Sequence, residues 1–220
     1  MSGYEYEYEW DGKYCYPNSF VLKNKLSIRN AKELSEAERR ITALNLLEIK
    51  EKPVRGRFDL KHLCAIHRAI FREIYAWAGE LRTVDIAKGN QFCLSQHIDA
   101  YADELFVKLK SEDFLRTAET ATIPERLTYY LSEINVLHPF REGNGRTQRV
   151  FIEYLAQAAG FHVDFSGVSE KEMIEASALS FAREYDRMTE MFRQIVTPIS
   201  PQEQQAFQRA IGTRRQTPNR

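Results

Sequence analysis

A histidine, a carboxylate, a glycine-rich run and two arginines fall within twelve consecutive positions. This segment runs from His138 to Arg149 and reads HPFREGNGRTQR. A proline disfavours helical geometry at the residue before it, so we expect a helix to end near His138. Two glycines flank Asn144, and helical periodicity resumes directly after them. The pattern predicts a helix, a short glycine-rich loop and a second helix.

A glycine-rich loop that opens a helix can bind anions. The first N–H groups of a helix have no intrahelical partner, and the helix dipole adds positive potential that suits phosphate. The loop residues here are Gly143, Asn144 and Gly145. Arg146 and Arg149 follow three positions apart, so one helix face should present both. Cations at a helix N-terminus cost about 0.3–1 kcal/mol each, so the two guanidiniums indicate a polyanionic ligand.

Two other side chains in the segment fit phosphate chemistry. Glu142 precedes the loop and would repel phosphate by itself, but Mg²⁺ between them would make it a ligand. His138 is the obvious proton acceptor, because histidine titrates near neutral pH. No Gly-Lys-Ser/Thr follows the glycines, and the element before them is helical. These facts argue against a Walker-type loop and against a dinucleotide-binding fingerprint.

One segment departs from the helical period. Between Leu81 and Leu94, apolar residues alternate with polar ones on either side of Lys88-Gly89-Asn90. Two short alternating runs around a glycine-containing turn predict a β-hairpin. An isolated hairpin on a helical body leaves exposed strand edges, which proteins normally protect or use.

The twelve-residue segment resembles the signature of the Fic family, His-Pro-Phe-x-Asp/Glu-Gly-Asn-Gly-Arg-x-x-Arg, and every specified position matches. The hairpin region also resembles the flap of that family, through Trp77-Ala78-Gly79, Arg82, Asp85-Ile86 and Lys88-Gly89. The resemblance extends over residues 55–196. It implies a mainly α-helical Fic-fold bundle with a small β-hairpin flap.

The resemblance implies an enzyme, a protein adenylyltransferase that moves AMP from ATP to a Ser, Thr or Tyr hydroxyl of a target protein and releases pyrophosphate. His138 would take the proton from the target hydroxyl. Phe140 would anchor the loop in the core, and Glu142 would hold the Mg²⁺ that bridges the α- and β-phosphates.

The same resemblance assigns the remaining site residues. The glycine loop, Gly143 to Gly145, would form the anion site, and Arg146 and Arg149 would hold the β- and γ-phosphates. Lys88 and Gly89, at the turn of the flap, would complete the ATP site. The flap would also clamp the target segment by strand addition.

Other functions remain open at this point. A few family members transfer a phosphoryl group, UMP or phosphocholine instead. A non-catalytic Fic-fold interaction module would need a damaged signature, whereas this one is intact. A helix-turn-helix that binds nucleic acid is disfavoured, because Lys plus Arg and Asp plus Glu both number 31 and the net charge is zero.

Many family members are inhibited by a helix with the pattern Ser/Thr-x-x-x-Glu-Gly/Asn, whose glutamate pairs with the arginine that matches Arg149. The nearest pattern here runs from Ser180 to Glu184 but continues with Tyr185. The resemblance therefore implies either a separate small antitoxin that supplies the inhibitory helix or an effector that acts after delivery. The sequence contains no secretory signal and no apolar run of the ~20 residues that span a bilayer. We expect the bacterial cytoplasm, or delivery into a host cell by a secretion system without a cleaved signal peptide.

Helical periodicity accounts for most of the chain. One predicted buried face steps by three and four through Leu34, Ala37, Ile41, Leu44 and Leu47. A length of 220 residues, 43% of them hydrophobic, fits one domain, or one domain with a decorated end.

We expect three parts in this chain. Residues 1–54 would form an N-terminal segment and a helix packed on the core, and residues 55–197 the Fic catalytic domain. Residues 198–220 would be a C-terminal tail or linker, because this stretch is rich in Gln and poor in apolar residues.

Overall fold

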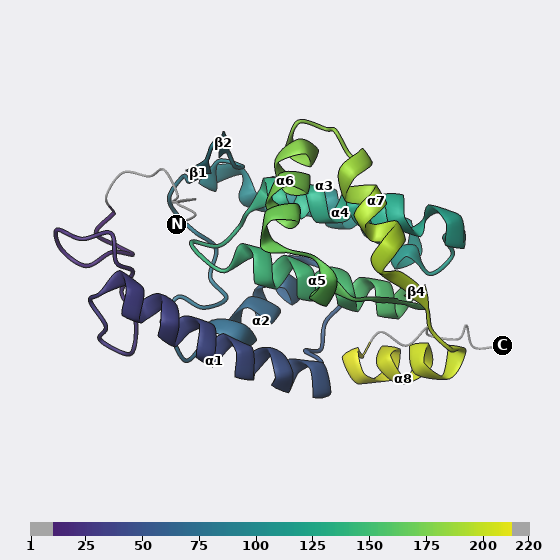
Figure 1. Cartoon of the computed structure of the whole chain (residues 1–220), viewed down its shortest axis with the longest axis horizontal. Helices are drawn as coiled ribbons and strands as arrows, with labels where there is room; N and C mark the ends of the chain where they lie inside the picture. The colour runs from purple at the N-terminus through teal and green to yellow at the C-terminus, as the bar shows by residue number, and fades with distance from the viewer. Residues whose placement is uncertain (1–10, 213–220) are drawn as a thin grey trace.

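The computed structural model describes residues 11–212, and expectations for residues 1–10 and 213–220 lie outside the described residues. Helices dominate the described chain (Figure 1). They are α1 (Ala31–Glu51), α2 (Leu60–Phe71), α3 (Ile98–Ser111), α4 (Ile123–Leu137), α5 (Asn144–Ala159), α6 (Glu170–Phe181), α7 (Asp186–Ile195) and α8 (Pro201–Ile211). Short 3-10 helices occupy Ser95–His97, Asp113–Leu115, Thr120–Thr122 and Phe165–Gly167. The strands are β1 (Ala87–Lys88), β2 (Asn90–Gln91), β3 (Phe161–Val163) and β4 (Val196–Pro198).

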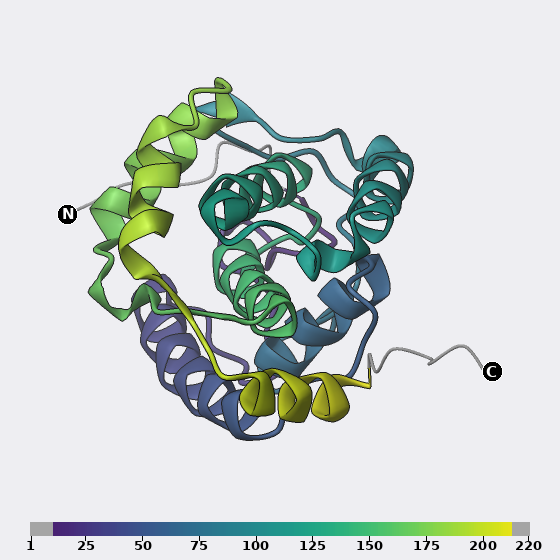
Figure 2. The ribbon, with the colours of Figure 1, turned by 90° about the vertical axis from the view of Figure 1, so that its right-hand side faces the viewer.

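The helices α4 and α5 form the centre of the bundle. Figure 2 shows this pair, in teal and green, surrounded by the other helices. Residues on the two helices, such as Ile134 and Leu155, are fully buried. The signature segment connects α4 to α5, so packing of both helices fixes its two ends. The expectation of a mainly α-helical bundle is confirmed.

The predicted hairpin is present but short. Strands β1 and β2 pair antiparallel, with Ala87 opposite Gln91 and Lys88 opposite Asn90. Gly89 sits at the turn with φ +72°, a left-handed conformation that glycine adopts readily. Each strand contributes two residues to the ladder, and the flanking side chains of Ile86 and Phe92 are buried, 2% and 7% exposed. The second pair, β3 with β4, joins two distant segments and was not predicted.

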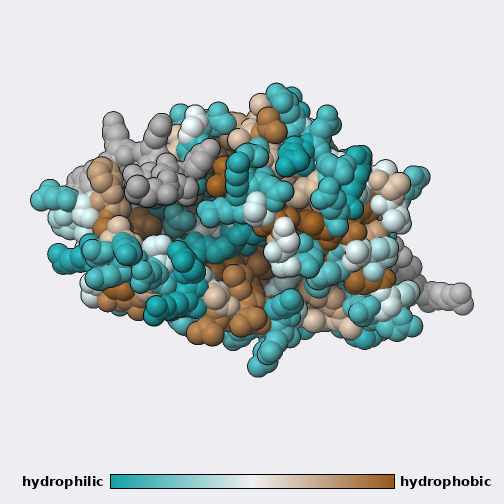
Figure 3. All heavy atoms as spheres, viewed as in Figure 1, coloured by the Kyte–Doolittle hydropathy of each residue, from teal (hydrophilic) through white to brown (hydrophobic). Residues whose placement is uncertain are grey.

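Helix α1 buries only part of the face that its apolar periodicity predicts, since Leu34 is buried and Ile41 packs against the core. Leu44 and Leu47 are 68% and 62% exposed, so their predicted burial is wrong. Figure 3 shows hydrophobic residues at the surface over the lower part of this view, where Figure 1 places α1. The buried residues of α1 are Leu34, Thr42, Asn45 and Ile49. Thr42 and Asn45 form hydrogen bonds to residues outside α1, and these bonds stabilise the observed orientation of the helix.

The stretch for which the sequence predicts a tail or linker contains helix α8, at residues 201–211. Ser200 caps this helix through a reciprocal capping box with Glu203. The amides of Gln204 and Gln208 both donate to the carbonyl of Ala158, at 2.9 and 2.8 Å, and Ile211 is 1% exposed. These glutamine contacts hold α8 against the end of α5. Apolar periodicity does not predict this helix. The division of the chain into three parts stays a prediction.

Within residues 11–212, no helix combines the length and hydropathy needed to cross a bilayer.

A matched pair of substitutions tests the orientation of α1. Leu34→Ala should lower the free energy of unfolding by about 2–5 kcal/mol, because this side chain is buried. Leu44→Ala should change it by less than about 0.5 kcal/mol, because this side chain is exposed. Urea denaturation measures both. Equal losses would mean that the face predicted from periodicity is the buried one.

Candidate active site

The signature segment turns sharply between α4 and α5. Helix α4 ends at Leu137, and His138 follows in a left-handed conformation, with φ +41° and ψ +58°. The predicted end of the helix before Pro139 is confirmed. Gly143 has φ +83°, and a Cβ atom there would lie 2.3 Å from the ring of Phe71. Both the conformation and the space therefore require glycine at this position.

The side chain of Asn144 braces the loop from inside. Its Oδ1 accepts a hydrogen bond from the Phe140 N–H at 2.9 Å, and its Nδ2 donates to the Phe140 carbonyl at 2.7 Å. Asn144 is 1% exposed. Its side chain is therefore committed to the loop, and its contribution to anion binding can come only from its backbone N–H, in the first turn of α5.

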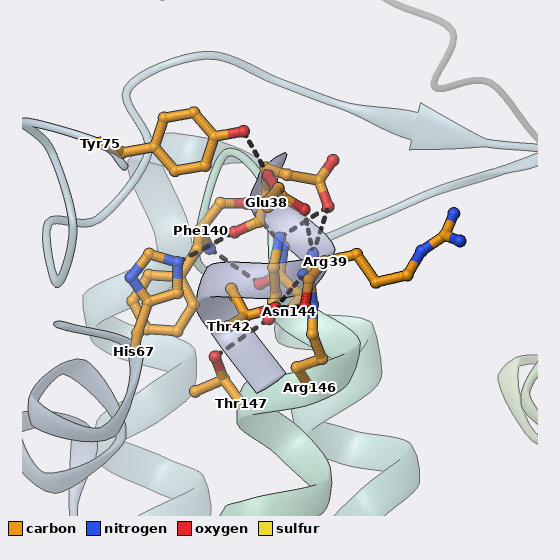
Figure 4. Close-up of polar contacts among 11 residues, drawn as sticks. Glu38, Arg39, Thr42, His67, Tyr75, Phe140, Asn144, Arg146 and Thr147 are labelled. Atoms are coloured by element: carbon orange, nitrogen blue, oxygen red, sulfur yellow. Dashed lines mark hydrogen bonds and ion pairs between the residues drawn. The ribbon is translucent and has the colours of Figure 1, made fainter. Parts of the chain in front are cut away.

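His67, on α2, holds the same loop through backbone contacts (Figure 4). Its ring stacks on Phe140 with centroids 3.9 Å apart. The Gly79 N–H donates to Nδ1 at 2.8 Å, so the ring proton lies on Nε2, which donates to the Glu142 carbonyl at 2.9 Å. Burial lowers the pKa of His67 to about 4, which keeps the ring neutral. Sequence reasoning missed this contact of His67 with the Glu142 backbone, because no local pattern signals it.

His138 has the tautomer that a general base needs. Its Nδ1 lies 3.0 Å from the Asn135 carbonyl, which can only accept, so Nδ1 carries the proton and Nε2 carries the lone pair. Burial lowers the pKa of His138 to about 3, with smaller contributions from the charges of Arg82 and Lys88. The ring of Phe92 stacks on the imidazole with centroids 3.7 Å apart. The imidazole is therefore neutral at pH 7 and held in one plane.

Arg82 joins the flap to His138. It is 2% exposed, and its Nε donates to the His138 carbonyl at 2.8 Å. Its guanidinium also donates to the carbonyls of Val84, at 2.7 Å, and of Cys93, on either side of the hairpin. The backbone of Arg82 adds a bond to the Pro139 carbonyl at 2.9 Å. One buried side chain thus fixes the base of the flap to the turn that carries His138.

A cavity of about 570 Å³ lies beside these residues. Its lining includes most of the predicted site residues: Lys88, His138, Glu142, Gly143, Gly145, Arg146 and Arg149. Residues of α6 supply a partly apolar wall, including Met173, Ile174, Ala178 and Phe181. The cavity therefore has one charged side and one apolar side, as a ligand with a phosphate chain and a flat base requires.

Three predicted site residues lie away from the cavity lining. Phe140 is 1% exposed and packs on His67, in agreement with an anchor. Asn144 is buried in the loop. Gly89 is at the tip of the flap, where an added Cβ would meet nothing within 4 Å. Gly89 and Asn144 therefore lie outside the cavity lining, and their role in ATP binding stays a prediction.

The two arginines of the signature have different surroundings. Arg146 is ion-paired with Glu38 on α1, with Nη2 and Oε1 2.6 Å apart. Sequence reasoning missed Glu38. Burial lowers the pKa of Arg149, and the positive charge of Arg146 adds to the shift. The two guanidiniums thus repel each other in a common cavity, which favours an anion between them.

Glu142 is the carboxylate of the site. Its Oε1 accepts a hydrogen bond from the Gly143 N–H at 2.8 Å. Burial, and next the negative charge of Glu38, raise its pKa, and the charge of Arg146 opposes them. A cation that reached this carboxylate would relieve both effects.

Comparison with known proteins gives consistent matches. Residues 57–156 match the Fic/DOC family. The chain is 37% identical to the protein adenylyltransferase VbhT of Bartonella schoenbuchensis, over 85% of this chain and 39% of that protein. It is also 37% identical to a probable protein adenylyltransferase Fic of Salmonella typhimurium, over 84% of this chain and 92% of that protein.

Solved structures agree with these matches. The BepC effector of Bartonella tribocorum with bound AMPPNP has a TM-score of 0.81 and 25% identity, covering 86% of this chain and 98% of that one. A Fic domain from a Bartonella quintana effector with bound ADP has a TM-score of 0.77 and 30% identity, covering 86% and 96%.

The pKa of His67 gives a testable pH dependence. The pKa of His67 lies near 4 in the folded chain and at the ordinary histidine value of 6.5 in the unfolded chain, so below about pH 6.5 the unfolded chain binds more protons than the folded chain. The contribution of His67 to stability is therefore present above pH 6.5 and is lost as pH falls toward 4. Between pH 7 and pH 5, the difference in unfolding free energy between wild type and His67→Gln should shrink by about 2 kcal/mol.

Urea denaturation at both pH values measures this difference. Comparison with the variant removes other groups, such as Glu153, whose raised pKa of about 7 acts in the opposite direction. His97→Gln, at an exposed position, is the control variant. A constant difference for His67→Gln would contradict the depressed pKa.

Proposed function

The chain belongs to the Fic/DOC family, and from this premise we propose that it transfers AMP from ATP to a Ser, Thr or Tyr hydroxyl of a target protein. Relatives that it matches over nine tenths of their length carry the name probable protein adenylyltransferase. The observation that carries the proposal is one arrangement: a neutral His138, the Glu142 carboxylate and the first turn of α5 line a single cavity. The chain spans only 39% of VbhT, so the proposal concerns this segment's own chemistry.

His138 acts as the general base in this proposal. Its Nε2 takes the proton of the target hydroxyl, and the hydroxyl oxygen attacks the α-phosphorus of ATP. The bond from that phosphorus to the bridging oxygen of the β-phosphate breaks, so that pyrophosphate leaves and AMP becomes esterified to the target. The hydrogen bond from Nδ1 to the Asn135 carbonyl stabilises the imidazolium that forms.

The phosphate chain lies along the N-terminus of α5 in this proposal. The first backbone N–H of this helix that has an intrahelical acceptor is that of Thr147, which donates to the Gly143 carbonyl at 3.2 Å. The N–H groups before Thr147 are therefore available to phosphate oxygens. Gly145 is exposed and lacks a side chain that would keep the phosphates away. Arg146 and Arg149 then neutralise the β- and γ-phosphates, and Lys88 adds positive charge from the flap.

Glu142 fits the role of a Mg²⁺ ligand. Among residues 11–212, no cluster of three or more His, Cys, Asp or Glu side chains could hold a metal by itself. Mg²⁺ commonly takes one or two carboxylates and completes its shell with substrate phosphates and water. When bound, it would neutralise charge on the α- and β-phosphates, and Glu142 would hold it beside the loop.

We also propose protein partners. Within residues 11–212, β1 and β2 pair only with each other, and Lys88 and Asn90 of this hairpin line the cavity, so a target segment could add to the hairpin as a further strand. A small antitoxin could insert a glutamate against Arg149, which lines the cavity and feels the positive charge of Arg146. The similar Bartonella structures are described as translocated effectors, which supports action either in the bacterial cytoplasm or in a host cell.

Two glycines of the loop should respond differently to alanine. Gly145→Ala should leave stability unchanged or raise it slightly, because an added Cβ would meet only Arg149 Nη1 at 3.6 Å, but it should weaken AMPPNP binding about tenfold or more by holding the phosphates off the backbone. Gly143→Ala should instead destabilise the fold by about 1–3 kcal/mol, because of its positive φ and the Phe71 ring. Thermal unfolding and calorimetry separate the two effects. Unchanged nucleotide binding by Gly145→Ala would contradict the phosphate position.

His138→Ala tests the proposed reaction directly. Incubation with lysate and α-labelled ATP should label target proteins with the wild type, and the variant should reduce transfer about 10²–10⁴-fold. His97→Ala, at an exposed position, should transfer label normally. Label from γ-labelled ATP should not appear on the target. Transfer of the γ-label would support phosphoryl transfer, and full activity of a folded His138→Ala would remove His138 from its role.

A further inference from the structure

Helix α1 buries a stripe of residues that includes three polar side chains. The stripe steps by three and four along one face: Leu34, Glu38, Thr42, Asn45 and Ile49. The Glu38 side chain is only 13% exposed. A buried carboxylate costs free energy unless it is paired, and a well-packed apolar residue would often be more stable in its place. Its presence beside the signature therefore needs a reason other than packing.

Both oxygens of Glu38 have specific partners, as Figure 4 shows. Oε1 pairs with Arg146 Nη2 at 2.6 Å, and Oε2 accepts a hydrogen bond from the Tyr75 hydroxyl. Burial, and then the charge of Glu38, raise the pKa of Tyr75, so the hydroxyl remains a donor. Two elements that are distant in sequence thus fix the orientation of the carboxylate.

The Arg146 guanidinium is held on several sides. Its Nη1 donates to Thr42 Oγ1 at 3.2 Å, and its Cζ lies 4.7 Å from the centre of the Phe71 ring. These contacts to α1 use two of the five N–H donors of an arginine, which leaves donors for a ligand in the cavity that Arg146 lines. An arginine that is held before the ligand arrives loses less side-chain entropy when it binds phosphate.

Glu38 and Glu142 compete for the same nitrogen. Arg146 Nη2 lies 2.6 Å from Glu38 Oε1 and 3.8 Å from Glu142 Oε1. Arg146 and Glu142 stand four residues apart across the start of α5, where such pairs form easily. Without the charge of Glu38, the guanidinium would move toward Glu142 and neutralise the carboxylate that a Mg²⁺ ion would need.

We propose that Glu38 is a positioning residue of the nucleotide site, which holds the Arg146 guanidinium ready for the phosphates and leaves the Glu142 carboxylate to Mg²⁺. The inference rests on the proposed function, because it assigns Arg146 and Glu142 to ATP and its metal. It makes α1, which lies outside the segment that matches the family, part of the working site.

Calorimetry with AMPPNP, with and without Mg²⁺, tests this role. Glu38→Gln keeps the size and one acceptor oxygen but removes the charge. We expect the Mg²⁺ concentration for half-maximal AMPPNP binding to rise about tenfold in this variant, whereas metal-free AMPPNP binding changes much less. A purely structural role would weaken both kinds of binding equally. Glu36→Gln, an exposed site two residues away on the same helix, is the matched control and should behave as wild type.

A double-variant comparison isolates the route through Arg146. If Glu38 acts through this arginine, adding Glu38→Gln to Arg146→Ala should cause no further loss of Mg²⁺-dependent binding. Tyr75→Phe removes one hydrogen bond to Glu38 and should raise the Mg²⁺ requirement by a smaller factor. This variant tests the role of Glu38 if Glu38→Gln does not fold.

The outcomes separate this inference from the proposed function. Wild-type binding of AMPPNP with an unchanged Mg²⁺ requirement in the folded variants overturns the role of Glu38 alone. The role of Glu38 is also overturned if Glu38→Gln weakens Mg²⁺-dependent AMPPNP binding as much in the Arg146→Ala variant as in the wild type. Failure of the wild type to bind AMPPNP with Mg²⁺ overturns the proposed function, and the role of Glu38 with it.

Discussion

The side chain of Asn144 hydrogen-bonds both the N–H and the carbonyl of Phe140, and the geometry of the site depends on this pair of bonds. The chain must reverse between two buried helices within six residues, and a backbone that turns so tightly cannot satisfy its own polar groups. Asn144 replaces the missing backbone partners. With Phe140 fixed, His138 and Glu142 project from the two ends of a rigid turn, and His67 adds a bond to the Glu142 carbonyl from α2.

Electrostatics places a second demand on the fold. Arg146 and Arg149 line one cavity, and the buried Arg82 lies against the backbone of His138. A cluster of like charges destabilises the folded state. The protein meets this cost by pairing each cation differently. Arg82 donates to backbone carbonyls, Arg146 pairs with Glu38, and Arg149 experiences more distant carboxylates. Charged side chains that are already oriented toward a ligand need no rearrangement when the ligand binds. This advantage can offset the repulsion between them in the folded state.

The sequence was sufficient to locate the signature turn, the hairpin and most helices. These features depend on local rules, such as the effect of Pro139 on His138 and the need for glycine at Gly143, and local rules can be read from neighbouring residues. The orientation of α1 could not be predicted, because Leu44 and Leu47 made the more apolar stripe while Thr42 and Asn45 found tertiary partners. Glu38 and His67 were missed for the same reason. Their partners lie 108 and 75 positions away in sequence, and no local pattern reports such pairs.

The contact between Phe92 and His138 joins the flap hairpin, where we propose that the target binds, to the proposed general base. Phe92 follows directly after β2, and its N–H bonds the Ile86 carbonyl at 3.3 Å, so the ring moves with the base of the flap. The same ring lies flat against the imidazole of His138. Arg82 links the other side of the flap to the His138 carbonyl. The contacts of Phe92 and Arg82 would therefore fix the position of a peptide that added to the hairpin relative to His138. The pairing of its backbone with the hairpin, and not a pocket for its side chain, would place its hydroxyl. If the proposed function holds, backbone register and not target sequence sets the distance from the hydroxyl to Nε2.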